Sequence, residues 1–259
     1  MAIELNEDEI SKKLAHYLDD PAVVAGLEAM VADPFLLAYF LMSVSEGEAL
    51  GEAGVGMIRE EEVAKLIHDI ERQQREEGGH KELTLDLAKD FFPEFFDDGE
   101  YRYRENLTGR DYYIYVLQEN RARLKSIDAY SRLNLYLTTT FGYEIMVGLY
   151  YGRVIDAIAA SDLAPELKDP ICAQLRRILD EEDTHLEIAT QHNVLIEADR
   201  ASLGARTVEL LEALETLSQD DYEWAAELSM KEIVKTVGRY AAGPRFRAEI
   251  ESGTMGAQK

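Results

Sequence analysis

Two short motifs in the sequence pair a glutamate with a histidine three residues further on. Glu77 precedes His80 in the run E-E-G-G-H, and Glu182 precedes His185 in the run E-E-D-T-H. On an α-helix this spacing places a carboxylate and an imidazole side by side on one face. Each pair alone is more typical of an exposed helix surface, because short motifs often match by chance. Two such pairs on two helices, with an inward glutamate on each of two others, form the ligand set of a di-metal site.

Two further glutamates interrupt apolar stripes of helical period, and they are the candidates for the remaining ligands. Glu46 lies within the stripe from Phe35 to Met57, and Glu144 lies within the stripe from Leu133 to Ile155. An unpaired charge buried on such a face is very costly, so each carboxylate needs a partner. The sequence therefore predicts six metal ligands on four helices: Glu46, Glu77, His80, Glu144, Glu182 and His185.

The positions of these glutamates along the chain agree with the predicted turns. In two antiparallel helices, residues at the same height lie equally far from the turn that joins them. The midpoint of the first two glutamates falls at residues 61–62, beside a predicted turn, and that of the last two falls at Leu163, within a Ser-Asp-Leu-Ala-Pro turn. Glu48 and Glu52 are alternatives to Glu46. Glu48 ranks second because it lies off the apolar stripe, and Glu52 moves the midpoint into the next helix.

The hydrophobic pattern predicts an all-α fold, because long stripes with a period of 3.6 residues run through the chain and the sequence has only six prolines. We expect a ferritin-like four-helix bundle with additional N- and C-terminal helices in a single domain over residues 1–251. The tail, residues 252–259, is expected to be disordered. The expected bundle core covers about residues 34–195, with long helices at about 34–57, 62–92, 111–160 (or broken near 126–131) and from 165 onward. Shorter helices are expected at 6–18, 21–30, 203–218 and 220–241, and an aromatic-rich crossover at 90–110.

The composition narrows the classes of partner and compartment. The formal net charge is −24, with 51 acidic against 27 basic residues, so nucleic acid and anionic membranes are not expected partners. The single cysteine, Cys172, allows no internal disulfide. No apolar run is long enough to span a bilayer, and the N-terminal residues lack a signal-peptide pattern. A soluble cytoplasmic protein is expected.

The types of the proposed ligands indicate which metals they suit, and their neighbours in the sequence are candidates for supporting contacts. Four carboxylates and two imidazoles are hard donors that suit iron or manganese, and their negative charge offsets two divalent cations. Glu76 and Glu181 each precede a motif glutamate and are candidates to accept a hydrogen bond from a ligand histidine, although solvent-facing positions fit them equally well. Tyr39, Tyr143 and Tyr151 lie near the expected centre, where ordinary core tyrosines are commoner than redox-active ones.

On these six residues the chain resembles the ferritin-like superfamily of carboxylate-bridged di-iron proteins. The resemblance implies activation of O2 at two iron ions, or at a manganese and an iron ion. It does not select one family. The arylamine N-oxygenases carry a further histidine where this chain has Ile178, and the bacterial multicomponent monooxygenases commonly carry an arginine where it has Thr184. Its length and aromatic crossover are unlike those of a ferritin.

Two functions follow from the resemblance. The first is an oxidase or oxygenase that uses O2 to oxidise a small organic substrate, with an electron donor and a homodimer formed through the last helices as expected partners. The alternative is a ferroxidase or iron-binding protein with no organic substrate. A helical protein that binds no metal ranks third. An apolar path that ends at the metals would favour the first function, and a closed site reached only through acidic side chains would favour the second.

Overall fold

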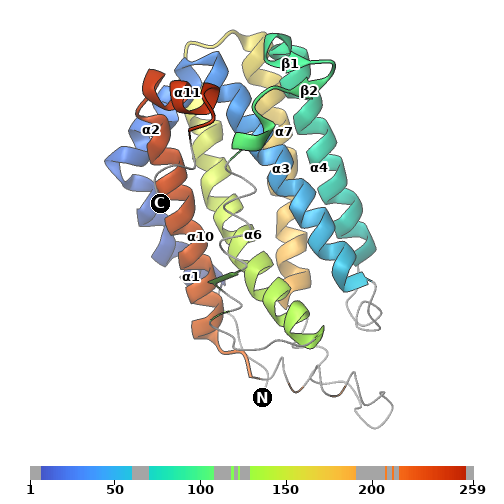
Figure 1. Cartoon of the computed structure of the whole chain (residues 1–259). Coiled ribbons are helices and arrows are strands. Elements are labelled where there is room, and N and C mark those ends of the chain that lie inside the picture. Colours follow the sequence, from blue (N-terminus) through green and yellow to red (C-terminus); the bar gives the residue numbers. More distant parts are fainter. Residues whose placement is uncertain are drawn as a thin grey trace.

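The computed structural model describes residues 7–59, 70–107, 129–190 and 216–254, and a few isolated positions between them. Within these ranges, the side chains of residues 7, 51–59, 70–74, 129–140 and 183–190 are not described. The described chain is helical apart from its turns and one pair of two-residue strands, so the prediction of an all-α fold is confirmed. Figure 1 shows the arrangement of the helices.

Four long helices carry the residues singled out by the sequence. They are α3 (Pro34–Arg59), α4 (Ile70–Phe91), α6 (Ala129–Ala160) and α7 (Pro165–Thr190). Helix α3 packs along α4, and α6 packs along α7, while α4 also contacts α7 and α3 contacts α6. In Figure 1, α3 and α7 run in one direction and α4 and α6 in the other. Side chains on the facing surfaces of these four helices are therefore brought toward one interior volume.

Aspartate–proline pairs begin the two helices that lead into this assembly. Asp20 Oδ1 accepts a hydrogen bond of 2.7 Å from the backbone N–H of Ala22 at the start of α2 (Pro21–Ala32). Asp33 Oδ1 accepts one of 2.9 Å from Phe35 at the start of α3. Such caps satisfy backbone donors that the first helical turn leaves unpaired, and proline is already set to the helical φ there. The sharp corner between α2 and α3 is thus encoded locally.

A second layer of helices covers one side of this assembly. Helix α10 (Gln219–Tyr240) packs against both α6 and α2, and α1 (Glu7–Leu14) packs against α10. A reciprocal capping box between Ser218 and Asp221 begins α10. The sequence predicted α10, but it did not predict α11 (Pro244–Glu251), which follows Gly243 at a positive φ of 50°. The short helix predicted at 6–18 is divided into α1 and the 3₁₀ helix η1 (Ala15–Asp19).

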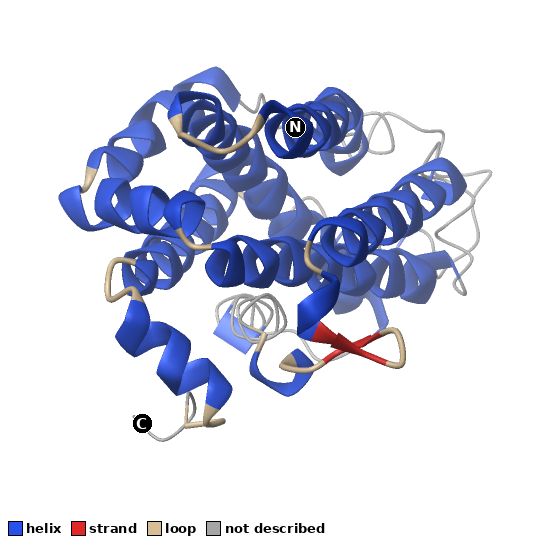
Figure 2. Cartoon of the chain, turned by 90° about the horizontal axis from the view of Figure 1, so that it is seen from above, coloured by secondary structure: helices blue, strands red, loops and turns tan. Residues whose placement is uncertain are grey.

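The aromatic crossover contains short, defined elements where a loop was expected. They are η3 (Pro93–Phe95), β1 (Phe96–Asp97), β2 (Glu100–Tyr101) and η4 (Arg104–Asn106). The turn between the two strands is Asp98–Gly99, with φ values of 50° and 83°. An Asp-Gly pair favours this turn because both of its residues need positive φ. Figure 2 shows the strand pair at the edge of the helical assembly.

Hydrogen bonds fasten the crossover to helices that are distant in sequence. The hydroxyl of Tyr39 on α3 donates to the backbone carbonyl of Asn106 at 2.7 Å. The Asn106 side-chain amide in turn donates to the carbonyl of Ile250 on α11 at 2.9 Å. The rings of Phe95 and Tyr103 pack edge-on against Phe35, each with centroids 5.2 Å apart. The crossover therefore closes the end of the interior at which α3 begins.

Several predictions fall on residues outside the described ranges. These are the turn at 61–62, the chain at 62–69, most of 111–128, most of the helix at 203–218, and the last residues of the tail. At the start of the expected tail, the backbone N–H of Ser252 donates to the carbonyl of Ala248, so this residue continues the C-terminal turn of α11.

No single described helix is both long enough and apolar enough to cross a membrane. Only the bent pair formed by α2 and residues 34–50 meets the length and composition criteria together, and its two parts meet at an angle of 108°.

The contact between α2 and α10 provides a test of this packing. A Cβ added at Gly26 would overlap the carbonyl oxygen of Val237 and lie 2.8 Å from its carbon. We expect Gly26→Ala to lower the free energy of unfolding by about 1–3 kcal/mol, because it overpacks two helix backbones. Gly148→Ala is the control: its Cβ meets no described atom within 4 Å, so it should leave stability unchanged or raise it by up to about 1 kcal/mol. Urea unfolding of both variants measures the difference, and equal stabilities would contradict the close contact.

Candidate metal centre

Each of the four long helices contributes one buried carboxylate to a single interior volume. Glu48 comes from α3, Glu77 from α4, Glu144 from α6 and Glu182 from α7, and none is more than 3% exposed. His80, one turn after Glu77 on α4, is fully buried beside them. Glutamate is almost never buried without a partner, so four in one place require a common explanation.

The ligand atoms fall into two groups that share one residue. Glu48, Glu77 and His80 form one group, and Glu77, Glu144 and Glu182 form the other. Within each group, one potential ligand atom from every residue lies within 4.8 Å of the others. Because Glu77 belongs to both groups, its carboxylate would be shared if both groups held a cation.

The orientation of His80 is set by Glu181, which accepts a hydrogen bond of 2.7 Å from Nε2–H across the interface between α4 and α7. An ionised carboxylate only accepts hydrogen bonds, so the proton of a neutral imidazole resides on Nε2. The ring then presents its Nδ1 lone pair to Glu48 Oε2 at 3.5 Å and to Glu182 Oε1 at 3.9 Å. A lone pair that faces carboxylates is the arrangement expected for a cation ligand. Glu181 thus makes a hydrogen bond to one of the candidate ligand histidines, and its role beside a bound metal stays a prediction.

Arg177 holds Glu181 in turn, through a hydrogen bond of 3.0 Å from Nε on the preceding turn of α7. Partial burial tends to raise the pKa of the Glu181 carboxyl, but the hydrogen bonds from Arg177 and His80, together with the positive charge of Arg177, outweigh burial and lower it. Glu181 is therefore ionised at neutral pH and remains an acceptor for His80. The three side chains link the solvent, where Arg177 is exposed, to the buried imidazole.

The structure corrects the prediction for the first helix, where Glu48 and not Glu46 reaches the interior. The Glu46 side chain is 20% exposed and lies 3.8 Å from Nε of Arg104 in η4, whereas the Glu48 side chain is fully buried. Helix α3 is covered by α2, α4 and α6, so most of its surface is apolar and more than one stripe fits its sequence. Residues 37, 41, 44 and 48 form such a second stripe, whose apolar members Leu37, Leu41 and Val44 could have indicated Glu48.

The sixth predicted ligand, His185, lies within α7 one turn after Glu182, but its side chain is outside the described residues. The described site therefore brings together four of the six predicted residues, Glu77, His80, Glu144 and Glu182, and adds Glu48.

Two tyrosines of α6 complete the surroundings of Glu48. The hydroxyl of Tyr143 donates to Glu48 Oε1 at 3.5 Å, and Tyr151 also hydrogen-bonds this carboxylate. Burial raises the pKa of both phenols well above the usual value, with smaller contributions from the charge of Glu48. Both tyrosines therefore stay neutral and serve as hydrogen-bond donors.

Burial changes the protonation of the carboxylates themselves. It raises the pKa of Glu48 from 4.5 to about 8, with the negative charge of Glu182 adding to the effect. Burial, and then the charge of Glu182, also raises the pKa of Glu144 well above the usual range. A cation among these groups would reverse both shifts, because it favours the ionised form.

The residues present could hold a metal ion. Every described donor is a carboxylate oxygen or an imidazole nitrogen, and no thiolate lies among them, since Cys172 packs elsewhere on α7 against the carbonyl of Ile155. Iron and manganese are among the metals that such donors suit, whereas soft metals favour thiolates.

Comparisons of the chain with protein-family models, with curated proteins and with solved structures find no match.

The placement of Glu48, and not Glu46, in the candidate site predicts different metal contents for two variants. Glu48→Ala should lower the metal content of purified protein, because it removes a ligand that faces His80. Glu46→Ala should retain the wild-type content, since this side chain lies beside Arg104. Elemental analysis after loading with ferrous or manganous ions measures both. Loss of metal in the Glu46 variant, with full retention in the Glu48 variant, would contradict the placement.

The raised pKa of Glu48 predicts a pH dependence of the metal-free protein. A carboxyl with a higher pKa in the folded state stabilises the fold fully below its unfolded pKa and loses this effect as pH rises. The loss should run from about pH 4.5 to about pH 8. We expect the melting temperature of the metal-free wild type to fall over this range more steeply than that of Glu48→Gln, which cannot ionise. Glu46→Gln should keep the wild-type slope, and parallel curves for all three proteins would refute the account.

Proposed function

We propose that this protein is a non-haem di-metal oxidase or oxygenase of ferritin-like fold. In this proposal α3, α4, α6 and α7 form the four-helix bundle, and the remaining helices are additions to it. Glu48 and His80 would hold one metal and Glu144 and Glu182 the other, with Glu77 belonging to both groups; His185 is the further ligand that the sequence predicts for the second metal. The observation that carries the proposal is the convergence of four buried carboxylates, one from each of these helices, with the imidazole of His80 on α4.

Two reduced iron ions, or a manganese and an iron ion, supply two electrons jointly to O2 when bound at such a centre. The protein's own residues supply the conditions for this chemistry. Glu181 and Arg177 fix the tautomer of His80, so that Nδ1 is available to a metal. Tyr143 and Tyr151 donate hydrogen bonds to Glu48 and orient its carboxylate. The surrounding helices exclude bulk water from the site.

The choice of an oxidase or oxygenase over a ferroxidase rests on the approach to the centre. A ferroxidase must admit iron repeatedly, and a cation is guided by acidic side chains. The described pocket beside Glu48 is lined by aromatic, aliphatic and hydroxyl-bearing residues, with no charged side chain among them. This route suits an uncharged molecule. An organic substrate would be oxidised at the expense of O2, with an external donor restoring the reduced metals.

The test begins with protein loaded anaerobically with ferrous iron and then mixed with O2. The wild type should hold about two irons per chain and consume O2 rapidly, as expected for a di-iron centre. Glu144→Ala should abolish rapid consumption while the helical content stays unchanged, because it removes a ligand of one metal only. Glu46→Ala is the matched control and should react as the wild type does. Equal O2 consumption by the Glu144 variant and the wild type would refute the proposal.

The same experiment separates the two functions. With excess ferrous iron and no reductant, an oxidase or oxygenase should stop after the irons of its own centre are oxidised. A ferroxidase would continue and accumulate ferric iron far beyond the content of the site. Continued accumulation would replace the proposed function with the alternative.

A further inference from the structure

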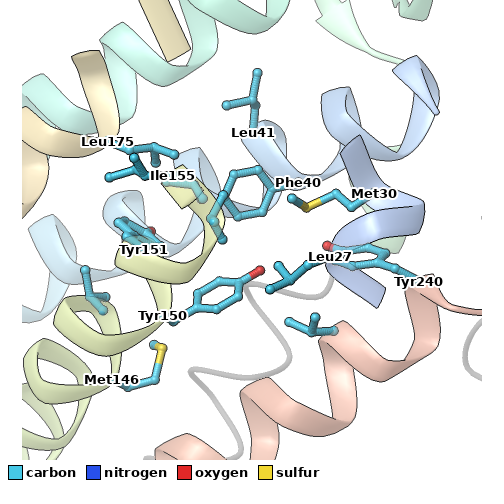
Figure 3. Close-up of a cluster of buried hydrophobic side chains, with 14 of the residues drawn as sticks. Leu27, Met30, Phe40, Leu41, Met146, Tyr150, Tyr151, Ile155, Leu175 and Tyr240 are labelled. Atoms are coloured by element: carbon cyan, nitrogen blue, oxygen red, sulfur yellow. The ribbon is translucent and has the colours of Figure 1, made fainter. Parts of the chain in front are cut away.

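A small pocket lies between α3, α6 and α10, next to the candidate metal centre. Its volume is about 50 Å³. Phe40, Val44, Met146 and Tyr150 form its walls, and all four are buried. Figure 3 shows Phe40, Met146, Tyr150 and Tyr151 together, with Tyr240 of α10 on the other side of Tyr150. The ring of Phe40 packs edge-on against those of Tyr150 and Tyr151, with centroids 6.1 and 6.4 Å apart.

The inner end of the pocket reaches the residues around Glu48. Gly47 and Tyr143 both line it, and Tyr143 donates a hydrogen bond to Glu48 Oε1. A Cβ at Gly47 would lie only 3.3 Å from the Tyr143 hydroxyl, so the glycine keeps this end open. The outer end is lined by Ile233 and Thr236 of α10, which are partly exposed. The pocket thus extends from partly exposed residues of α10 to Tyr143, which hydrogen-bonds Glu48.

The size and chemistry of the pocket restrict its occupant. An engineered apolar cavity of about 150 Å³ takes up benzene or xenon, so one of about 50 Å³ is too small for an aromatic ring without rearrangement. Its walls offer no charged partner, and an ion would lose its hydration there without compensation. An uncharged, apolar molecule of a few atoms fits both limits.

We propose that this pocket admits dioxygen to the metal centre, which rests on the proposed function because dioxygen reacts there only if a reduced metal pair is held beside Glu48. The route ends on the side of the centre occupied by Glu48 and His80. A metal held by these two residues would be the one nearer the pocket. Residues of α10, which contribute no ligand, thereby control the access of a co-substrate.

The test uses two pocket-filling variants and one matched control on the same helix. Ile233→Trp and Thr236→Phe place bulky rings at the outer end, where partial exposure leaves room for the helix to stay folded. Lys235→Trp adds the same indole to α10 at a side chain that is 71% exposed and outside the pocket. Circular dichroism and iron stoichiometry establish that each variant is folded and loaded.

The first measurement is xenon binding to the metal-free protein, by ¹²⁹Xe NMR and in pressurised crystals, with toluene as the larger probe. Xenon should occupy the pocket of the wild type and of Lys235→Trp, and should be lost from both filling variants. Toluene should not bind. The second measurement is the dependence of ferrous oxidation on O2 concentration, whose second-order rate constant should fall several-fold in the filling variants and stay unchanged in the control.

Each contrary result has a separate meaning. Absence of xenon from the wild type, or xenon binding with an unchanged oxidation rate in both filling variants, overturns the dioxygen route while leaving the di-metal function intact. Toluene that displaces xenon from the wild type marks a substrate pocket and also overturns the assignment to dioxygen. A wild type that binds xenon but holds no iron refutes the proposed function, and the route with it.

Discussion

The interior of this protein must accommodate four carboxylates in one water-poor volume. Removing even one carboxylate from water costs several kcal/mol unless it is paired. Here Glu48, Glu77, Glu144 and Glu182 lie together with the imidazole of His80. Burial and the negative charge of Glu182 raise the pKa values of Glu48 and Glu144. Divalent cations would stabilise the ionised carboxylates, and the same contacts would then join four helices at their centre.

The sequence predicted the ligands best where a local spacing encoded them. Glu77 and His80 share a helix face at any orientation of α4, so the pair needs only an inward-facing helix to reach the centre. Glu46 was chosen from apolar periodicity, which gives a single answer only when one face of a helix is buried. Helix α3 is covered on several sides, and the ion pair of Glu46 with Arg104 depends on the crossover folding back onto it. Periodicity alone could not rank Glu46 against Glu48.

Contacts between distant segments were beyond prediction from one sequence. The Asp98–Gly99 turn depends on two adjacent residues, so it is encoded locally. In contrast, the hydrogen bonds that join Tyr39, Asn106 and Ile250 connect three separate segments. The pocket is of the same kind, since α10 supplies its outer end from far along the chain. The site thus has a polar side set by local motifs and an apolar side set by tertiary packing, and the proposed chemistry needs both.

Anomalous X-ray diffraction at the iron edge, from crystals grown anaerobically with ferrous iron, tests the central claim most directly. The account predicts two anomalous peaks in the volume enclosed by the four helices, with Glu77 in contact with both and Nδ1 of His80 directed at the one nearer Glu48. No peak in this volume, or iron bound only at acidic residues of the surface, would contradict it.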